Sequence, residues 1–176
     1  MQTQSKITYT LGAAMLVTCT KKFHLAAFAL ALLAPTFGFA ADPVAKTDGE
    51  TAGLRIEVVE LKRGSGDTLT VRFNLINDSG EKFEPKGWYF GDYKGHQNQD
   101  IGSVGALTLI DTVGKKKYFV VRDTDENCVC SNPIPSVNAK SRAALWAKFP
   151  APPSDVKKIG VVIPHFIPMD DVPISQ

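Results

Sequence analysis

The sequence contains few of the side chains that enzymes use for chemistry. Its 176 residues include three histidines and three cysteines, and His24 and Cys19 fall within the first forty residues. There is no Gly-x-Ser-x-Gly elbow, His-Glu-x-x-His zinc motif, P-loop or Gly-x-Gly-x-x-Gly turn. Without a recognisable catalytic or cofactor-binding set, we predict a protein that is not an enzyme and carries no cofactor.

The chain also lacks an excess of charge of either sign beyond its first forty residues. Lys6, Lys21 and Lys22 lie in that first part, which has no Asp or Glu, and the remainder has 17 basic and 18 acidic residues, a net charge of −1. Proteins that bind nucleic acid through its phosphates usually carry a basic patch or stripe. The sequence therefore predicts no nucleic-acid partner.

The N-terminal region is typical of a secretory signal peptide. Lys21 and Lys22 precede the apolar run 25–34 (LAAFALALLA), and the small-residue site 38–40 precedes Ala41. This order of basic, apolar and small residues predicts a cleaved signal peptide over residues 1–40. Cleavage would make Ala41 the first residue of the mature protein.

The apolar run is also too short to be a membrane anchor, because a transmembrane helix needs about 20 apolar residues. We therefore expect a periplasmic or secreted protein with no transmembrane span after cleavage. Met15 is an alternative start, since twenty residues before the lysine pair are unusual for a signal peptide.

The mature chain is predicted to begin with a flexible linker, residues 41–53, which is small, polar and without apolar periodicity. A single domain follows over residues 54–176. Its clearest strand is 68–75, where apolar and polar residues alternate. In the strand 54–61 the alternation changes phase at Val59, which predicts a β-bulge.

Further strands are expected at 104–110, 117–122, 142–149 and 158–163, and no stretch shows the apolar stripe of a helix. About seven short strands separated by turns predict an all-β, immunoglobulin-like antiparallel β-sandwich with little or no helix. We expect one core, formed by Leu69, Val71, Phe73, Leu109, Tyr118, Val120, Leu145, Phe149, Val161 and Ile163.

One segment resembles a known family. The string LWAKFPAPPSDVKKIGVVIPHF within residues 144–166, together with 117–119 and the loop containing Cys128-Val129-Cys130-Ser131, is similar to small exported immunoglobulin-like domains of bacteria. These domains occur alone or ahead of envelope modules such as OmpA-type peptidoglycan-binding domains. The resemblance implies a sandwich in the cell envelope and implies no established activity.

Two segments are longer than ordinary turns, and long ordered loops on a rigid scaffold often carry function. The first, 83–103, is rich in glycine and aromatic residues. It offers a possible interaction loop formed by Trp88, Tyr89, Phe90, Tyr93 and His96. The alternative is that Trp88 packs into the core while the other aromatic residues shield the edge of the sheet.

The second long segment, 123–140, contains the two cysteines of the mature chain. Cys128 and Cys130 are expected to form a disulfide in an oxidising compartment. A soft metal held by both thiolates and an imidazole from His96 or His165 is the alternative.

The same segment places Asp123, Asp125 and Asn127 at alternate positions, as in the first part of a calcium loop. The glycine and the glutamate that an EF-hand needs further along are missing. A solvated acidic loop is therefore the expected role of these residues, with calcium binding as the alternative.

The sequence thus leads to two hypotheses of different class. The first is a non-enzymatic cell-envelope module whose loops contact an unknown envelope protein or cell-wall component. The second is a periplasmic metal-binding or redox protein that acts through Cys128 and Cys130.

Overall fold

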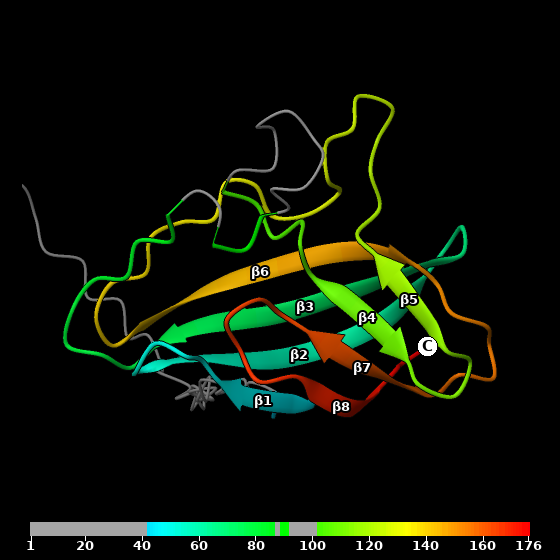
Figure 1. Ribbon diagram of the computed structural model, residues 1–176, viewed down its shortest axis with the longest axis horizontal. Coiled ribbons are helices and arrows are strands. Elements are labelled where there is room, and N and C mark those ends of the chain that lie inside the picture. The colour runs from blue at the N-terminus through cyan, green and yellow to red at the C-terminus, as the bar shows by residue number, and fades with distance from the viewer. Residues whose placement is uncertain (1–41, 87–88, 92–101) are drawn as a thin grey trace, which may run out of the picture. The chain divides into compact units, whose positions relative to one another are not determined.

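A computed structural model describes residues 42–86, 89–91 and 102–176 of the chain (Figure 1). The predicted signal peptide 1–40 and its cleavage before Ala41 lie outside the described residues. Trp88, Tyr93 and His96 of the predicted interaction loop also lie outside them.

The described residues form two four-stranded antiparallel sheets, with strand orders β1-β2-β3-β6 and β5-β4-β7-β8. They contain no helix, and so none that is long and apolar enough to cross a membrane. The strands are β1 (Ala45–Asp48), β2 (Leu54–Gly64), β3 (Thr68–Asn77), β4 (Thr108–Asp111), β5 (Lys116–Phe119), β6 (Ser141–Pro150), β7 (Lys158–Val162) and β8 (Met169–Pro173).

The strand order is that of an immunoglobulin-like sandwich. In sequence, β4 and β5 lie between β3 and β6, yet they pair as a hairpin in the opposite sheet while β3 pairs with β6. With β1 set aside, strands β2 to β8 form sheets of three and four strands joined by connections that cross between the sheets. The predicted all-β sandwich is therefore confirmed.

Alternation along the strands builds the core. On β3 the residues Leu69, Val71, Phe73 and Leu75 are each at most 1% exposed, because every second side chain points between the sheets. The register between β2 and β3 shifts between Val58 and Glu60, which confirms the predicted bulge. Of the ten predicted core residues, nine are buried and Tyr118 is partly buried.

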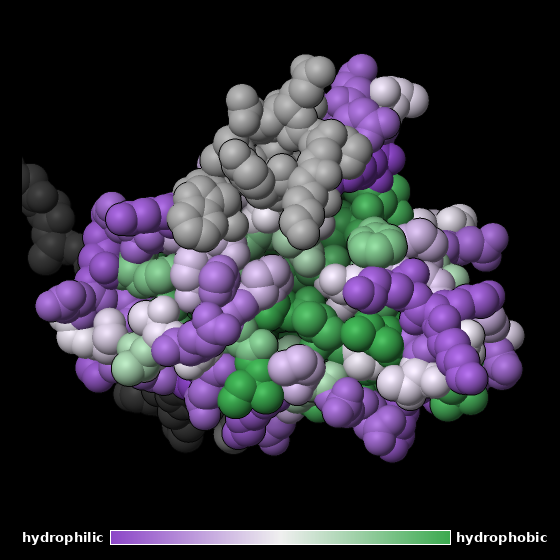
Figure 2. All heavy atoms as spheres, in the orientation of Figure 1, coloured by the Kyte–Doolittle hydropathy of each residue, from purple (hydrophilic) through white to green (hydrophobic). Residues whose placement is uncertain are grey.

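Some large apolar side chains lie on the outward faces of the sheets. Figure 2 is oriented toward the sheet containing β4 and β7 and shows apolar residues gathered in the middle of this view, with hydrophilic residues around the margins. Phe119 on β5 is 65% exposed. Trp146 on β6 is 40% exposed, so large apolar side chains lie on the solvent faces of both sheets.

The predicted flexible linker over residues 41–53 is wrong. Residues 45–48 form β1, which pairs with 55–58 of β2, and the hydroxyl of Thr47 donates to the carbonyl of Ile167 at 2.8 Å. An edge strand gains its order from backbone hydrogen bonds to its neighbour, so it needs no apolar periodicity of its own. The ordered domain therefore includes residues N-terminal to Leu54.

One predicted strand also needs correction. The strand expected at 104–110 begins only at Thr108, because Val104 and Leu107 are buried in a turn, with the amide of Leu107 bonded to the carbonyl of Val104. Pro150 and Pro173 are the last residues of β6 and β8. Both strands lie at sheet edges, where a residue without an amide hydrogen is tolerated.

Candidate functional site

The two long connections, β3 to β4 and β5 to β6, pair with each other. Phe83 and Val137 exchange both backbone hydrogen bonds at 2.8 Å, and the amide of Ile134 donates to the carbonyl of Gly102 at 2.7 Å. In Figure 1 both connections run beside β6. We call the described residues of 78–107 and 120–140 the loop cap.

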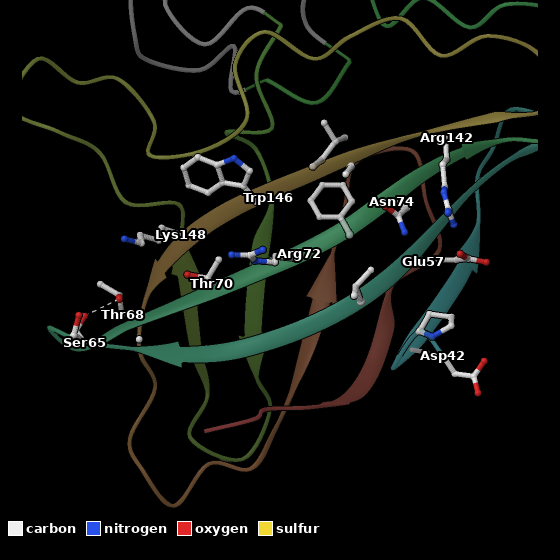
Figure 3. Close-up of a pocket in the computed structure, with 16 residues that line it drawn as sticks. Asp42, Glu57, Ser65, Thr68, Thr70, Arg72, Asn74, Arg142, Trp146 and Lys148 are labelled. Carbon is white, nitrogen blue, oxygen red and sulfur yellow. Dashed lines mark hydrogen bonds between the residues drawn. The ribbon is translucent and has the colours of Figure 1, made fainter. Parts of the chain in front are cut away.

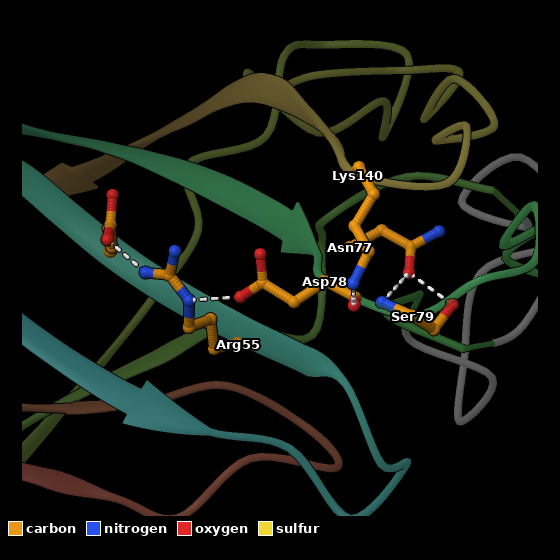
Figure 4. A network of polar contacts seen from close by, with 6 residues as sticks. Arg55, Asn77, Asp78, Ser79 and Lys140 are labelled. Atoms are coloured by element: carbon orange, nitrogen blue, oxygen red, sulfur yellow. Dashed lines mark hydrogen bonds and ion pairs between the residues drawn. The ribbon is translucent and has the colours of Figure 1, made fainter.

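A buried asparagine holds the base of the loop cap. Asn77, the last residue of β3, is 0% exposed, and its Nδ2 lies within hydrogen-bond distance of the carbonyls of Glu81, Val137 and Asn138, at 2.7, 3.0 and 3.2 Å. Its Oδ1 accepts from the amide and the hydroxyl of Ser79, as Figure 4 shows. Both long connections are thereby fixed to the end of one strand.

Charged groups support the same strand end (Figure 4). The Nε of Arg55 lies 2.6 Å from Oδ2 of Asp78, and the guanidinium also contacts Glu57. The Lys140 ammonium donates to the backbone carbonyl of Asp78. The hydrogen bond to Asp78, followed by that to Glu57, raises the pKa of Arg55 above its ordinary value. These contacts join β2, the turn after β3 and the residue before β6.

The structure confirms the disulfide between Cys128 and Cys130, whose Cα atoms are 5.3 Å apart. In this state neither sulfur is a thiolate, and thiolates are the ligands that soft metals require. Cys130 is buried and Cys128 is partly buried in the loop cap.

The disulfide-bonded segment covers the free edge of β6. The amide of Lys148 donates to the carbonyl of Val129 at 3.0 Å, and the amide of Ser131 donates to the carbonyl of Trp146 at 2.8 Å. The amide of Trp146 in turn donates to Oγ of Ser131 at 3.0 Å. An edge strand with unpaired backbone groups invites association with other chains, so this cover also protects β6.

The acidic residues form a closed turn. Oδ1 of Asp123 accepts hydrogen bonds from the backbone amides of Asp125 and Asn127, both at 2.9 Å. The hydrogen bond from the backbone amide of Asn127 is the main cause that lowers the pKa of Asp123 below its ordinary value. Within the described ranges, no three His, Cys, Asp or Glu side chains come together as a metal site.

Phe90 belongs to the core, so its predicted place in an interaction loop is wrong. It is 0% exposed and stacks on Phe166 with ring centroids 5.9 Å apart. Its carbonyl also accepts from the amide of Ala106 at 2.9 Å. A side chain removed from water in this way stabilises the loop and is not available to a partner.

Tyr89 is only partly buried and lies in a cluster that the sequence did not reveal. Its ring stacks on His165 at 4.2 Å, and its hydroxyl lies 3.3 Å from Oγ1 of Thr51. Nδ1 of His165 is 3.0 Å from Oε2 of Glu50, and the backbone amide of Glu50 donates to the carbonyl of His165. The cluster joins the turns that follow β1 and β7 to the loop cap.

No sequence signal pointed to this cluster, because His165 and Glu50 are 115 residues apart and neither belongs to a motif. The arrangement can orient an aromatic ring and an imidazole at the surface, where the His165 side chain is 33% exposed. It therefore offers a recognition surface whose groups are already fixed in place.

Comparison of the chain with protein-family models, curated proteins and solved structures found no match.

Proposed function

We propose that the protein is a non-enzymatic module of the bacterial cell envelope, periplasmic or secreted, that presents the loop cap to a protein or a cell-wall component. The observation that carries this proposal is the pairing of two long loops, fixed to β3 by the buried Asn77. Loops that are held on a rigid scaffold bind with less loss of entropy than free loops.

Two further observations support the location. The disulfide between Cys128 and Cys130 is of a kind that persists in oxidising compartments outside the cytoplasm. The basic, apolar and small-residue order of the first forty residues is that of an export signal. The resemblance of residues 144–166 to exported envelope domains agrees with both.

The test combines fractionation with site-specific photo-crosslinking in bacteria that express the full chain. A photoreactive residue at Ser136, exposed in the loop cap, should trap an envelope component, whereas one at Val113, 92% exposed in the β4–β5 turn, should not. Retention of the chain in the cytoplasm with residues 1–40 uncleaved would contradict the proposed location. Identical products from both positions would contradict the role of the loop cap.

The disulfide itself favours a second candidate, a redox protein that acts through Cys128 and Cys130. The pair lies in a surface loop, and Cys128 is only partly buried. Measurement of the thiol–disulfide equilibrium against glutathione, with metal analysis of the reduced protein, tests this candidate. A potential near that of the periplasm or stoichiometric metal would favour it over a purely structural disulfide.

A further inference from the structure

Strand β6 has one apolar row and one mixed row. Its inward residues Ala143, Leu145, Ala147 and Phe149 are buried, while the outward positions 142, 144, 146 and 148 line a hollow on the outer face of the sheet. Figure 3 shows Trp146, Arg142 and Lys148 along β6, with Thr70, Arg72 and Asn74 on the neighbouring β3. The hollow is therefore lined by side chains from regular strands, which hold their positions well.

Trp146 presents a partly exposed indole in this hollow. The side chain is 40% exposed, although tryptophan on the solvent face of a sheet is expected to cover as much apolar surface as it can. Its backbone is bonded to Ser131 through both its amide and its carbonyl, so the disulfide-bonded segment holds the backbone from which the indole projects. A tryptophan side chain has only two torsions, so ordering it on binding costs little entropy.

The surroundings of Trp146 are basic. The residues that line the hollow from β3 and β6 include Arg72, Arg142 and Lys148. Two carboxylates line its other part: Asp42, which precedes β1, and Glu57 on β2, which is in contact with Arg55. Arg72 is paired with Glu60 of β2 at 3.2 Å. For Arg142 and Lys148 there is no carboxylate partner among the described residues, so their charge is available to an anionic ligand.

From these observations we infer that the hollow binds an anionic polysaccharide, with one sugar ring stacked on Trp146 and its carboxylate or phosphate groups beside Arg142 and Lys148. Outward positions two residues apart on a strand are separated by about 6 to 7 Å, comparable with the length of one sugar unit. Ala144 leaves room between Arg142 and the indole, and Thr70 and Asn74 add neutral groups that bind hydroxyls.

An acidic peptide is a poorer fit. Extended peptides usually gain affinity by adding a strand to a free sheet edge. At positions 146–148 the edge of β6 is already bonded to Val129 and Ser131, so a ligand must lie on the face and not along the edge. Stacking on an indole also suits the apolar face of a sugar ring better than the carboxylate side chains of an acidic peptide.

This inference rests on the proposed envelope role and names a chemical class for the cell-wall component. Calorimetric titration of the mature protein with oligogalacturonate, and separately with a phosphorylated mannan oligosaccharide, tests it. We expect at least one probe to bind, and Trp146→Ala to weaken that binding roughly tenfold or more, as for a central tryptophan anchor. Trp146→Phe should retain most of the affinity of the unaltered protein, because phenylalanine keeps a flat ring on which a sugar can stack.

Matched controls separate stacking and charge from general effects. Phe119→Ala removes an exposed ring from the other sheet and should leave binding unchanged. Arg142→Gln with Lys148→Gln should weaken binding and reduce its dependence on salt, whereas Lys116→Gln with Lys117→Gln on β5 should do neither. Unfolding midpoints of all variants show whether each remains folded.

Three results would overturn the inference: no binding of either probe, equal binding by Trp146→Ala and the unaltered protein, or tighter binding of polyglutamate of the same charge. None of these results contradicts the proposed envelope role, provided that crosslinking at Ser136 still traps a partner. Loss of export and of crosslinking, with the oligosaccharide still bound, would instead overturn the proposed function alone.

Discussion

The side-chain amide of Asn77 donates to the backbone carbonyl of Val137 at 3.0 Å, although the two residues are 60 positions apart. One buried polar side chain thus closes the two loops that carry the proposed function. A buried amide that satisfies several backbone groups stabilises a loop only while all its partners remain in place.

Asn77→Ala should lower the free energy of unfolding by about 2 to 4 kcal/mol, because the change removes the hydrogen bonds of a fully buried side chain to both long connections and leaves a cavity in its place. Urea unfolding measures the loss. Asn74→Ala is the matched control: Asn74 lies on the same strand but faces outward, so its change should cost about 0.5 kcal/mol or less. Equal effects of the two changes would show that the Asn77 network does not hold the loop cap.

Phe73→Ala should cost about 3 to 5 kcal/mol, since Phe73 is 1% exposed between the sheets and its truncation leaves a cavity. Phe119→Ala makes the same chemical change at a side chain that is 65% exposed, and should cost about 1 kcal/mol or less. The comparison by urea or thermal unfolding tests the core directly. A smaller loss at Phe73 than at Phe119 would contradict the assignment of the core.

The core and the sheets could be predicted because alternation depends on local sequence. Leu69, Val71 and Phe73 alternate with polar residues, and only one face of such a strand can be buried. Strand β1 could not be predicted in this way, because residues 45–48 owe their order to pairing with β2. The composition of residues 45–48 does not show that β2 will pair with them.

The site was less predictable than the fold. The disulfide followed from two cysteines in a chain predicted to be exported, but its position against the edge of β6 depends on contacts between Ser131 and Trp146. Tyr89 was expected at the surface with His96, whereas the structure pairs it with His165 from the turn after β7. Contacts between residues that are far apart in the sequence are determined by the sheet topology, and they leave no periodic signal in the sequence.

The turn at Asp123 should loosen in acid. Its pKa is lowered, so the carboxylate stabilises the folded turn above the ordinary value of 3.8, and this contribution is lost as the pH falls through the lower folded value. Nuclear magnetic resonance titration should show the amides of Asp125 and Asn127 changing with a midpoint below 3.8. Asp123→Asn keeps an acceptor oxygen but removes the titration, so those midpoints should disappear.

A normal or raised midpoint at Asp123 would contradict the hydrogen bonds of this turn. The same titration in Asp125→Asn provides the control. Asp125 supplies only its backbone amide to the turn, so the midpoint of Asp123 should remain low in that variant.

The final prediction concerns the disulfide. Cys128→Ser with Cys130→Ser should lower the stability of the sandwich by no more than about 1 to 2 kcal/mol, because on the chain-entropy model a bridge that closes only three residues constrains the unfolded chain little. The effect should concentrate where the segment meets β6. We expect faster amide exchange at Ser131, Trp146 and Lys148, whose backbone amides bond across this junction, and little change at β3. Reduction of the unaltered protein should reproduce this pattern, and a reductant should have no further effect on the double variant. Complete unfolding of that variant, or uniformly faster amide exchange across both sheets, would contradict this prediction. Either result would mean that the disulfide stabilises the whole sandwich and not only the segment that covers the edge of β6.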